Sequence, residues 1–312
     1  WLVLSYWGVN RVTESMALLD SIAARDPLYK PAIGNRVFQL SWMGRGDEAR
    51  AELEAVEPFM PGDPQIQGAR AWIDFSQGAV ASGLRRAEKA LESQPNDRTY
   101  KVSVNQGRFH SHQFEQVSDD HWSDYSVWAL FNLERIEEAT ILARKLAADG
   151  NITSLFALFN ASGQSDLLLK YFENRWSDLD TFEQEVPARM WGYREKADLA
   201  FAFRKSGSQE RFNDAKTRLE SASDSSYAQG IRSGEFLRVY AAYHAMAGDS
   251  QAELNHLAAA IDGGMIVSIR IIKEYPNFRE LDGDPEYEAI QARMIEHLNR
   301  ERELLGLEPI ST

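Results

Sequence analysis

The 312-residue chain contains no cysteine. This excludes disulfide bonds, thiolate nucleophiles and cysteine-ligated metal ions, and it is compatible with either redox compartment. No run of about 18 apolar residues occurs, so no segment is expected to span a bilayer. The apolar stretch at residues 1–4 is far too short. No positively charged segment precedes an apolar core and a small-residue cleavage site, so no signal peptide is predicted.

Basic residues are fewer than acidic ones. The chain has 47 Asp and Glu against 34 Lys and Arg, a net charge of -13. Such a balance gives no general attraction to nucleic acid or to an anionic membrane surface. We therefore expect no direct nucleic-acid contact and no membrane insertion. With 44% hydrophobic and 26% charged residues, the composition is typical of a folded protein with one long solenoid or two domains.

Landmark residues recur at a regular spacing. Pro27, Pro61 and Pro95 lie 34 residues apart, and Gly44 and Gly78 keep the same step. Further pairs at this spacing are Leu19 and Leu53, Ala49 and Gly83, and Phe38 and Trp72. A period of 34 with a proline closing each unit is typical of a helix-turn-helix repeat. Because one helix pair cannot bury its own apolar face, successive pairs are expected to stack.

The residues at fixed places in these units resemble those of the tetratricopeptide-repeat family. Ala71 occupies the small position of a first helix, Ala90 a small position in a second helix, and Pro95 the closing place. Arg70 stands where the family has a leucine, and Gly83 where it has an alanine. The resemblance implies an all-α, right-handed superhelix of about six helix pairs with a C-terminal capping helix.

The pattern divides the chain into four parts. Residues 1–95 carry the N-terminal repeats, and residues 96–121 break the period as a helical remnant plus a loop. Residues 122–265 carry degenerate repeats, and residues 266–312 form a capping segment. Asp284 before Pro285 is predicted to cap the long final helix. Counting back from the next unit places Trp1 inside a first helix, so we expect that the chain is cut from a longer parent.

Residues 276–287 combine a proline and a phenylalanine, a leucine, and then Asp-Pro followed by an aromatic residue. This pattern resembles the closing segment found after tetratricopeptide-like repeats in large bacterial regulators, including winged-helix transcription regulators, adenylate cyclases and some kinases. It implies a C-terminal repeat domain that serves an upstream output module in signalling. We expect a cytoplasmic protein, or a periplasmic one if an upstream segment carries an anchor.

The histidines do not indicate a strong metal site. His110 and His112 are two residues apart, a spacing that suits two ligands on a strand but not on a helix. Asp119, Asp120 and His121 would complete a cluster only if the loop folded back. We therefore predict no metal site.

Other chemical motifs also fail in detail. A calcium loop that started at Asp282 would have Tyr287 at its glycine position and Arg293 at its glutamate position. Phosphate-binding glycine motifs, a nucleophile-elbow serine and the zinc-protease histidine pair are absent. We therefore predict no catalytic residues, no cofactor and no enzyme activity.

An aromatic stripe is the best candidate for a binding surface. Aligning the first helices places aromatic residues at equivalent positions in several units, on the concave side of the expected fold. Such a stripe predicts a groove for an extended or helical peptide, in which rigid rings supply most of the contact energy. The predicted peptide-binding residues are Phe38, Trp42, Trp72, Phe75, Trp128 and Phe131. The alternative is that these rings pack in the core between helices.

The sequence thus predicts a non-catalytic protein-interaction or sensor module that binds a peptide or a partner protein on its concave face. In the family's best-known peptide pocket, lysine and asparagine side chains hold a terminal carboxylate, whereas Pro31, Gly34 and Phe38 occupy these places here. This favours an apolar or aromatic ligand. The alternative function is a self-association scaffold, a homo-oligomer in which another copy or the chain's own tail fills the stripe. An enzyme domain ranks third.

Overall fold

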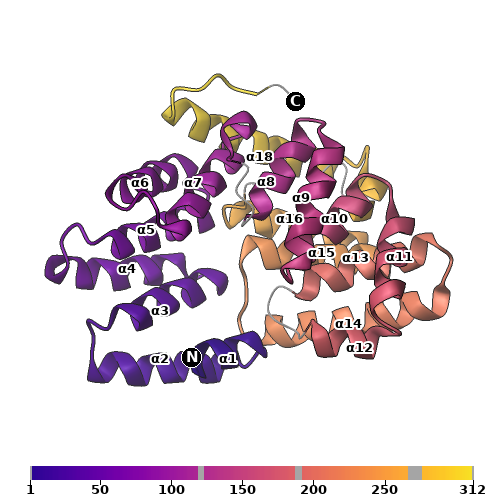
Figure 1. Ribbon diagram of the computed structural model, residues 1–312, viewed down its shortest axis with the longest axis horizontal. Coiled ribbons are helices and arrows are strands. Elements are labelled where there is room, and N and C mark those ends of the chain that lie inside the picture. The colour runs from indigo at the N-terminus through magenta and orange to yellow at the C-terminus, as the bar shows by residue number, and fades with distance from the viewer. Residues whose placement is uncertain (1, 119–122, 187–191, 266–275, 311–312) are drawn as a thin grey trace.

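The computed structural model describes residues 2–118, 123–186, 192–265 and 276–310. Within these ranges the protein has 17 α-helices, three short 3-10 helices and no strand. This confirms the all-α part of the predicted fold class. No described helix is both long and apolar enough to cross a membrane. Figure 1 shows α1–α7 stacked in chain order along one side of the molecule, with α9–α16 on the other side.

The helices of the first part are α1 (Leu2–Gly8), α2 (Val12–Arg25), α3 (Lys30–Trp42), α4 (Gly46–Val56), η1 (Glu57–Phe59), α5 (Pro64–Ser76), α6 (Val80–Ser93) and α7 (Arg98–His110). Those of the second part are η2 (Phe114–Gln116), α8 (Asp124–Asn132), α9 (Ile136–Ala148), α10 (Thr153–Ala161), α11 (Ser165–Arg175), α12 (Leu179–Glu185), α13 (Gly192–Lys205), α14 (Gln209–Ala228), α15 (Gly234–Ala247) and α16 (Ser250–Asp262). The described tail holds η3 (Pro276–Leu281) and α18 (Pro285–Leu304). The segment 96–121, expected as a helical remnant plus a loop, contains the 13-residue helix α7.

Local sequence signals set the helix ends. The Asp63 carboxylate accepts two backbone N–H groups in the first turn of α5, at 2.9 and 3.3 Å, and Pro64 takes the first helical position. Asp284 accepts two N–H groups in the same way at the start of α18, at 2.8 and 3.2 Å, which confirms the predicted cap. Gly44 and Gly78 follow helix ends with φ of +71° and +77°. Glycine adopts this left-handed conformation without a Cβ penalty, so it ends a helix readily.

Consecutive helices pack as pairs through small residues. Ala71 of α5 is fully buried where α5 meets α6. A Cβ at Gly83 of α6 would lie 2.6 Å from the Phe75 ring, so glycine suits this close approach better than the alanine expected from the resemblance. Arg70, the other departure, is 9% exposed and donates to Glu57 at 2.6 Å. Its buried charge is therefore compensated.

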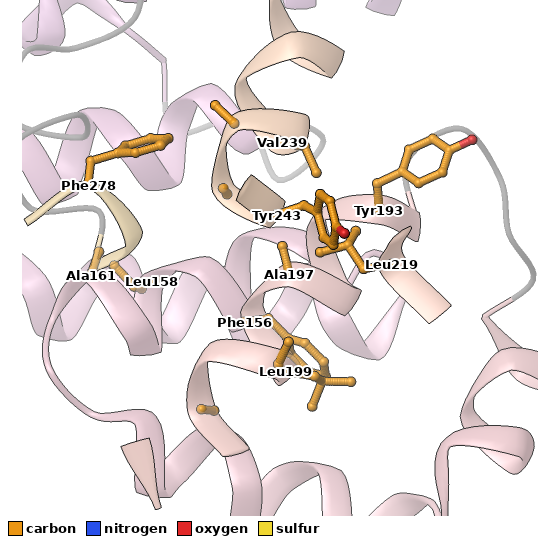
Figure 2. Packing of buried hydrophobic residues seen from close by; sticks show 14 of the residues in the cluster. Phe156, Leu158, Ala161, Tyr193, Ala197, Leu199, Leu219, Val239, Tyr243 and Phe278 are labelled. Carbon is orange, nitrogen blue, oxygen red and sulfur yellow. The ribbon is translucent and has the colours of Figure 1, made fainter. Parts of the chain in front are cut away.

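The largest apolar core lies in the second part of the chain. It joins side chains from α10, α13, α14, α15 and η3, among them Leu158, Ala197, Leu219, Val239 and Phe278 (Figure 2). Because Phe278 is fully buried in it, the tail belongs to the same folded unit. Smaller clusters hold the first helix pairs together.

The first helix pairs contact the later part of the chain at several places. At the end of α3, the Trp42 carbonyl oxygen accepts the backbone N–H groups of Arg232 and Ser233, at 3.1 and 2.9 Å. At the start of α6, the Ala81 N–H donates to Glu301 of α18 at 2.7 Å. The chain therefore closes on itself, and one side of α3 and of α5 faces the second part of the same chain.

Gly264 makes the closest contact of this closure. A Cβ built on Gly264 would lie 2.2 Å from the Gln77 carbonyl carbon, and the residue has φ of +89°. His297 Nε2 of α18 lies 2.9 Å from the Gly78 carbonyl oxygen at the same junction. No side chain larger than hydrogen fits at residue 264 while the two backbones remain in place.

We expect Gly264→Ala to destabilise the protein more than Gly283→Ala. Gly283 has a similar φ of +86° but no atom within 4 Å of an added Cβ, so alanine there costs only the backbone conformation, about 1 kcal/mol. At Gly264 the two segments must also separate, which adds about 2 kcal/mol or more. Urea unfolding of both variants measures the difference. Equal losses would contradict the proposed role of this contact in closure.

Candidate functional site

Four of the six aromatic residues predicted to bind a peptide line one cavity. They are Trp42, Trp72, Phe75 and Trp128. The other two lie directly against them. The Phe38 ring is 5.2 Å from the Trp72 ring, measured between centroids, and Phe131, only 1% exposed, packs edge-to-face on Trp128 at 5.6 Å. The six rings thus form a lining layer and a layer that supports it.

The cavity has a volume of about 800 Å³ and lies between the first helix pairs and the second part of the chain. Its lining comes from α3, α5, α7, α8, α10, α13 and α15. Phe109 and Tyr125 add two more rings, 5.6 Å apart between centroids. Pockets for small molecules are commonly about 300–1,000 Å³. The space therefore suits a small molecule or a short peptide segment better than a long helix.

Charged residues also line the cavity, and the sequence prediction did not find them. Among the described residues, six carboxyl groups and two guanidinium groups contribute: Asp124, Asp149, Glu185, Glu195, Asp198, Glu235, Arg194 and Arg238. Glu195 and Asp198 are three residues apart on α13, a spacing that places them on one helix face. That spacing was the only available signal, and it does not reveal that the face is buried.

Glu235 is held by two arginines. Its Oε1 accepts from Arg194 Nε at 2.8 Å and from Arg238 Nη2 at 2.7 Å. Burial by itself would raise the pKa of Glu235, but the two guanidinium groups outweigh this effect and lower the pKa to about 2. Glu235 therefore stays ionised and fixes α13 to α15.

Glu195 has the opposite environment. Its side chain is 3% exposed, and the Thr153 hydroxyl donates to its Oε1. Its Oε2 has no hydrogen-bond partner among the described residues. Burial raises the pKa of Glu195, and the charge of Asp124 raises it further, while Thr153 and Arg194 offset only part of the shift. The pKa values of the two carboxyl groups are therefore shifted in opposite directions, upward for Glu195 and downward for Glu235.

The two histidines considered as metal ligands take different roles. His110 lines the cavity, and its ring lies 5.6 Å from that of Tyr125. His112 adopts a left-handed φ of +58° and lies 4.8 Å from the Phe114 ring. Residues 119–121 lie outside the described part of the chain. Within the described ranges, no group of three or more His, Asp or Glu side chains is arranged to hold a metal ion.

Unsatisfied polar atoms border this cavity. In the described part of the chain, Trp72 Nε1, Ser154 Oγ and Glu195 Oε2 are buried without a hydrogen-bond partner, and all three residues belong to the lining. A buried polar atom without a partner costs about 1–3 kcal/mol, so a hydrogen bond to any of these three atoms would be favourable. Together with the rings, they suit a ligand that has an apolar body and polar groups.

No protein-family model matches the sequence, and no curated protein is significantly similar to it. The function therefore has to be inferred from the cavity itself.

Replacing Glu235 by glutamine is expected to destabilise the protein in a pH-dependent way. The folded-state pKa of about 2 lies below the ordinary value, so the ion pairs stabilise the fold above the unfolded pKa. This stabilisation is lost as pH falls toward 2. Glu235→Gln should lower the free energy of unfolding by roughly 3 kcal/mol at pH 7 and by less at pH 4. Urea unfolding at both pH values measures this.

Glu195→Gln is expected to behave in the reverse manner. A raised folded-state pKa means that the stabilising contribution is fully present below the unfolded pKa and is lost as pH rises. Glutamine stays neutral at every pH. The Tm difference, variant minus wild type, should therefore become more positive from pH 4 to pH 7. Thermal unfolding followed by circular dichroism tests this, and a Tm difference that falls over the same interval would contradict the environment assigned to Glu195.

Proposed function

We propose that the chain is a non-catalytic binding module of the tetratricopeptide-like type, a superhelical repeat whose ligand occupies the central cavity. The ligand is a short peptide segment of a partner protein, with an apolar or aromatic side chain. The 34-residue period and the packing of sequential helix pairs support the repeat assignment. The size and lining of the cavity support binding.

The observation that carries the proposal is the partial exposure of Trp72 and Trp128 among buried rings. Both tryptophans are half-buried and line the cavity. Their neighbours Trp42, Phe75 and Phe131 are 6% exposed or less. Rigid aromatic rings offer a large contact area and lose little entropy on binding, so they contribute strongly to affinity. Rings packed behind them hold both tryptophans in place before a ligand arrives.

A regulatory role agrees with this placement of the cavity. The cavity lies between the first helix pairs and the second part of the chain, so a bound ligand contacts both. A ligand that binds one arrangement of these parts more tightly shifts the population toward it. We propose that the domain is the sensing part of a bacterial regulator, on the resemblance of residues 276–287 to the closing segment of such proteins.

Self-association is less well supported. The chain's own final helix contacts α6 through Glu301 and Ala81, and no described residue of α18 lines the cavity. The tail therefore does not fill the aromatic site. A second copy would have to insert a segment into a space of about 800 Å³. Light scattering distinguishes the two functions, because a mass that stays monomeric at all concentrations would rule out the scaffold.

An acid–base enzyme is the second candidate, because two carboxyl groups with opposite pKa shifts share one cavity. In several hydrolases such a pair supplies the acid and the base. Glu195 has the raised pKa expected of a general acid. However, the pKa of Glu235 is about 2 and two arginines bind it, which makes it a weak base at neutral pH. Binding therefore accounts for the site better than catalysis.

We expect Trp72→Ala and Trp128→Ala to weaken ligand binding strongly and to leave the helical circular dichroism unchanged. Each substitution removes an aromatic contact of a kind that dominates peptide interfaces, so binding should weaken about tenfold or more. The measurement is calorimetric titration with N-acetylated, C-amidated tetrapeptides that contain Leu, Phe or Trp. Phe59→Ala is the control, because Phe59 is 70% exposed and lies outside the cavity. Binding by the tryptophan variants as tight as that of Phe59→Ala would contradict the proposal.

A further inference from the structure

Two carboxyl groups of the cavity have only neutral hydrogen-bond partners among the described residues. Asp124 at the start of α8 accepts from the Asn151 amide at 2.9 Å. Glu195 on α13 accepts from the Thr153 hydroxyl, and its second oxygen is unpartnered although the side chain is 97% buried. A buried carboxyl group is normally paired or fully hydrogen-bonded. The two acids therefore form a site with acceptor capacity left over.

The arginines of the cavity are already engaged elsewhere. Arg194 Nε and Arg238 Nη2 both donate to Glu235 Oε1. Even without Glu195, five acidic side chains line the cavity beside two guanidinium groups. The cavity as a whole thus carries an excess of negative charge, and a positively charged group is favoured in it.

Aromatic rings lie beside the same acids. Tyr125 follows Asp124 in the chain, and Trp72 and Trp128 line the same space. The faces of such rings attract cations, most strongly where water is excluded. Carboxyl groups and ring faces together are the combination that recognises ammonium and guanidinium groups.

We propose that the cavity binds a ligand with a cationic ammonium or guanidinium group, which lies between Asp124 and Glu195 while the apolar part lies against Trp72 and Trp128. This inference deepens the proposed function and rests on it. The ligand is then a peptide segment that carries a lysine, an arginine or a free N-terminus next to an apolar side chain. Its N–H donors satisfy the open oxygen of Glu195.

Binding of such a cation is coupled to release of a proton. In the empty cavity burial raises the pKa of Glu195, so this side chain keeps its proton to a higher pH than an exposed glutamate does. A cation beside it favours the carboxylate, and the proton leaves to the buffer. The affinity for a cationic ligand therefore rises with pH, whereas the affinity for a neutral ligand of the same shape does not.

Calorimetric titration with matched peptides tests the proposal on the full chain. The probes are acetyl-Phe-Lys-Leu-amide and its neutral analogue acetyl-Phe-norleucine-Leu-amide, in two buffers of different ionisation enthalpy at pH 5 and pH 8. At pH 8 we expect the lysine peptide to bind about tenfold or more tightly than its neutral analogue. Its binding should also release protons. Phe-norleucine-Leu-amide with a free N-terminus and 2-phenylethylamine identify which kind of amine is preferred. Equal binding of the cationic and neutral probes would overturn the proposal.

Two Glu→Gln variants distinguish a role of Glu195 in the site from a general effect of removing a buried carboxyl group. Glu195→Gln should remove the preference for the lysine peptide and its proton release. Glu253→Gln should leave both intact. Glu253 is a matched control. It is 2% exposed, one of its oxygens has no partner among the described residues, and burial raises its pKa to about 8. Unlike Glu195, it lies outside the cavity. Retention of the preference and of proton release in Glu195→Gln would overturn the assignment.

The outcomes distinguish this inference from the proposed function. One outcome is that the neutral peptide binds, that Trp72→Ala abolishes this binding, and that the lysine peptide binds no more tightly than the neutral one. The cavity is then a peptide site without a cation subsite. If Trp72→Ala alters the binding of no probe, the proposed function itself is wrong.

Discussion

The backbone contact between Gly264 and residues 77 and 78 holds the arrangement together. Helix pairs that stack in one direction leave an inner side that has to be covered or exposed to solvent. Here the second part of the chain covers it, through this contact, through the hydrogen bonds of Trp42 and through α18. Because no Cβ fits at residue 264, the distance between the two parts is set by backbone atoms, which yield little. The central cavity is the space that this closure leaves.

Electrostatic environment, not residue type, separates the acids of the cavity. Glu195 and Glu235 carry the same carboxyl group. Two guanidinium groups within 2.8 Å hold Glu235 in its charged form, while burial outweighs the single hydroxyl donor at Glu195 and raises its pKa. A group with a shifted pKa and an open hydrogen-bonding position can respond to a ligand, whereas a group saturated by ion pairs cannot. This difference is the physical basis of the proposed preference for a cationic ligand.

The aromatic site shows how far periodicity predicts function. The 34-residue step relates Phe38 to Trp72, and alignment of the unit after the break in the period adds Trp128 at the equivalent position. These rings, or the ones directly against them, meet at one cavity. Periodicity did not separate Trp128, which lines the cavity, from Phe131, which is buried behind it. The two are one helical turn apart on the same face, so only the neighbouring helices decide which ring meets open space.

The sequence by itself determined the local structure: all-α content, capped helix starts such as Asp63 and Asp284, glycine ends such as Gly78, and consecutive helices that pack as pairs. These features depend on residues within a few positions of one another, where propensity and periodicity act directly. Only the tertiary structure decided that the chain closes, because partners such as Ala81 and Glu301 are 220 residues apart and no local pattern links them. The charged lining follows from that closure. A helix face reveals its polarity in the sequence, but the environment that shifts a pKa comes from whatever the fold places opposite.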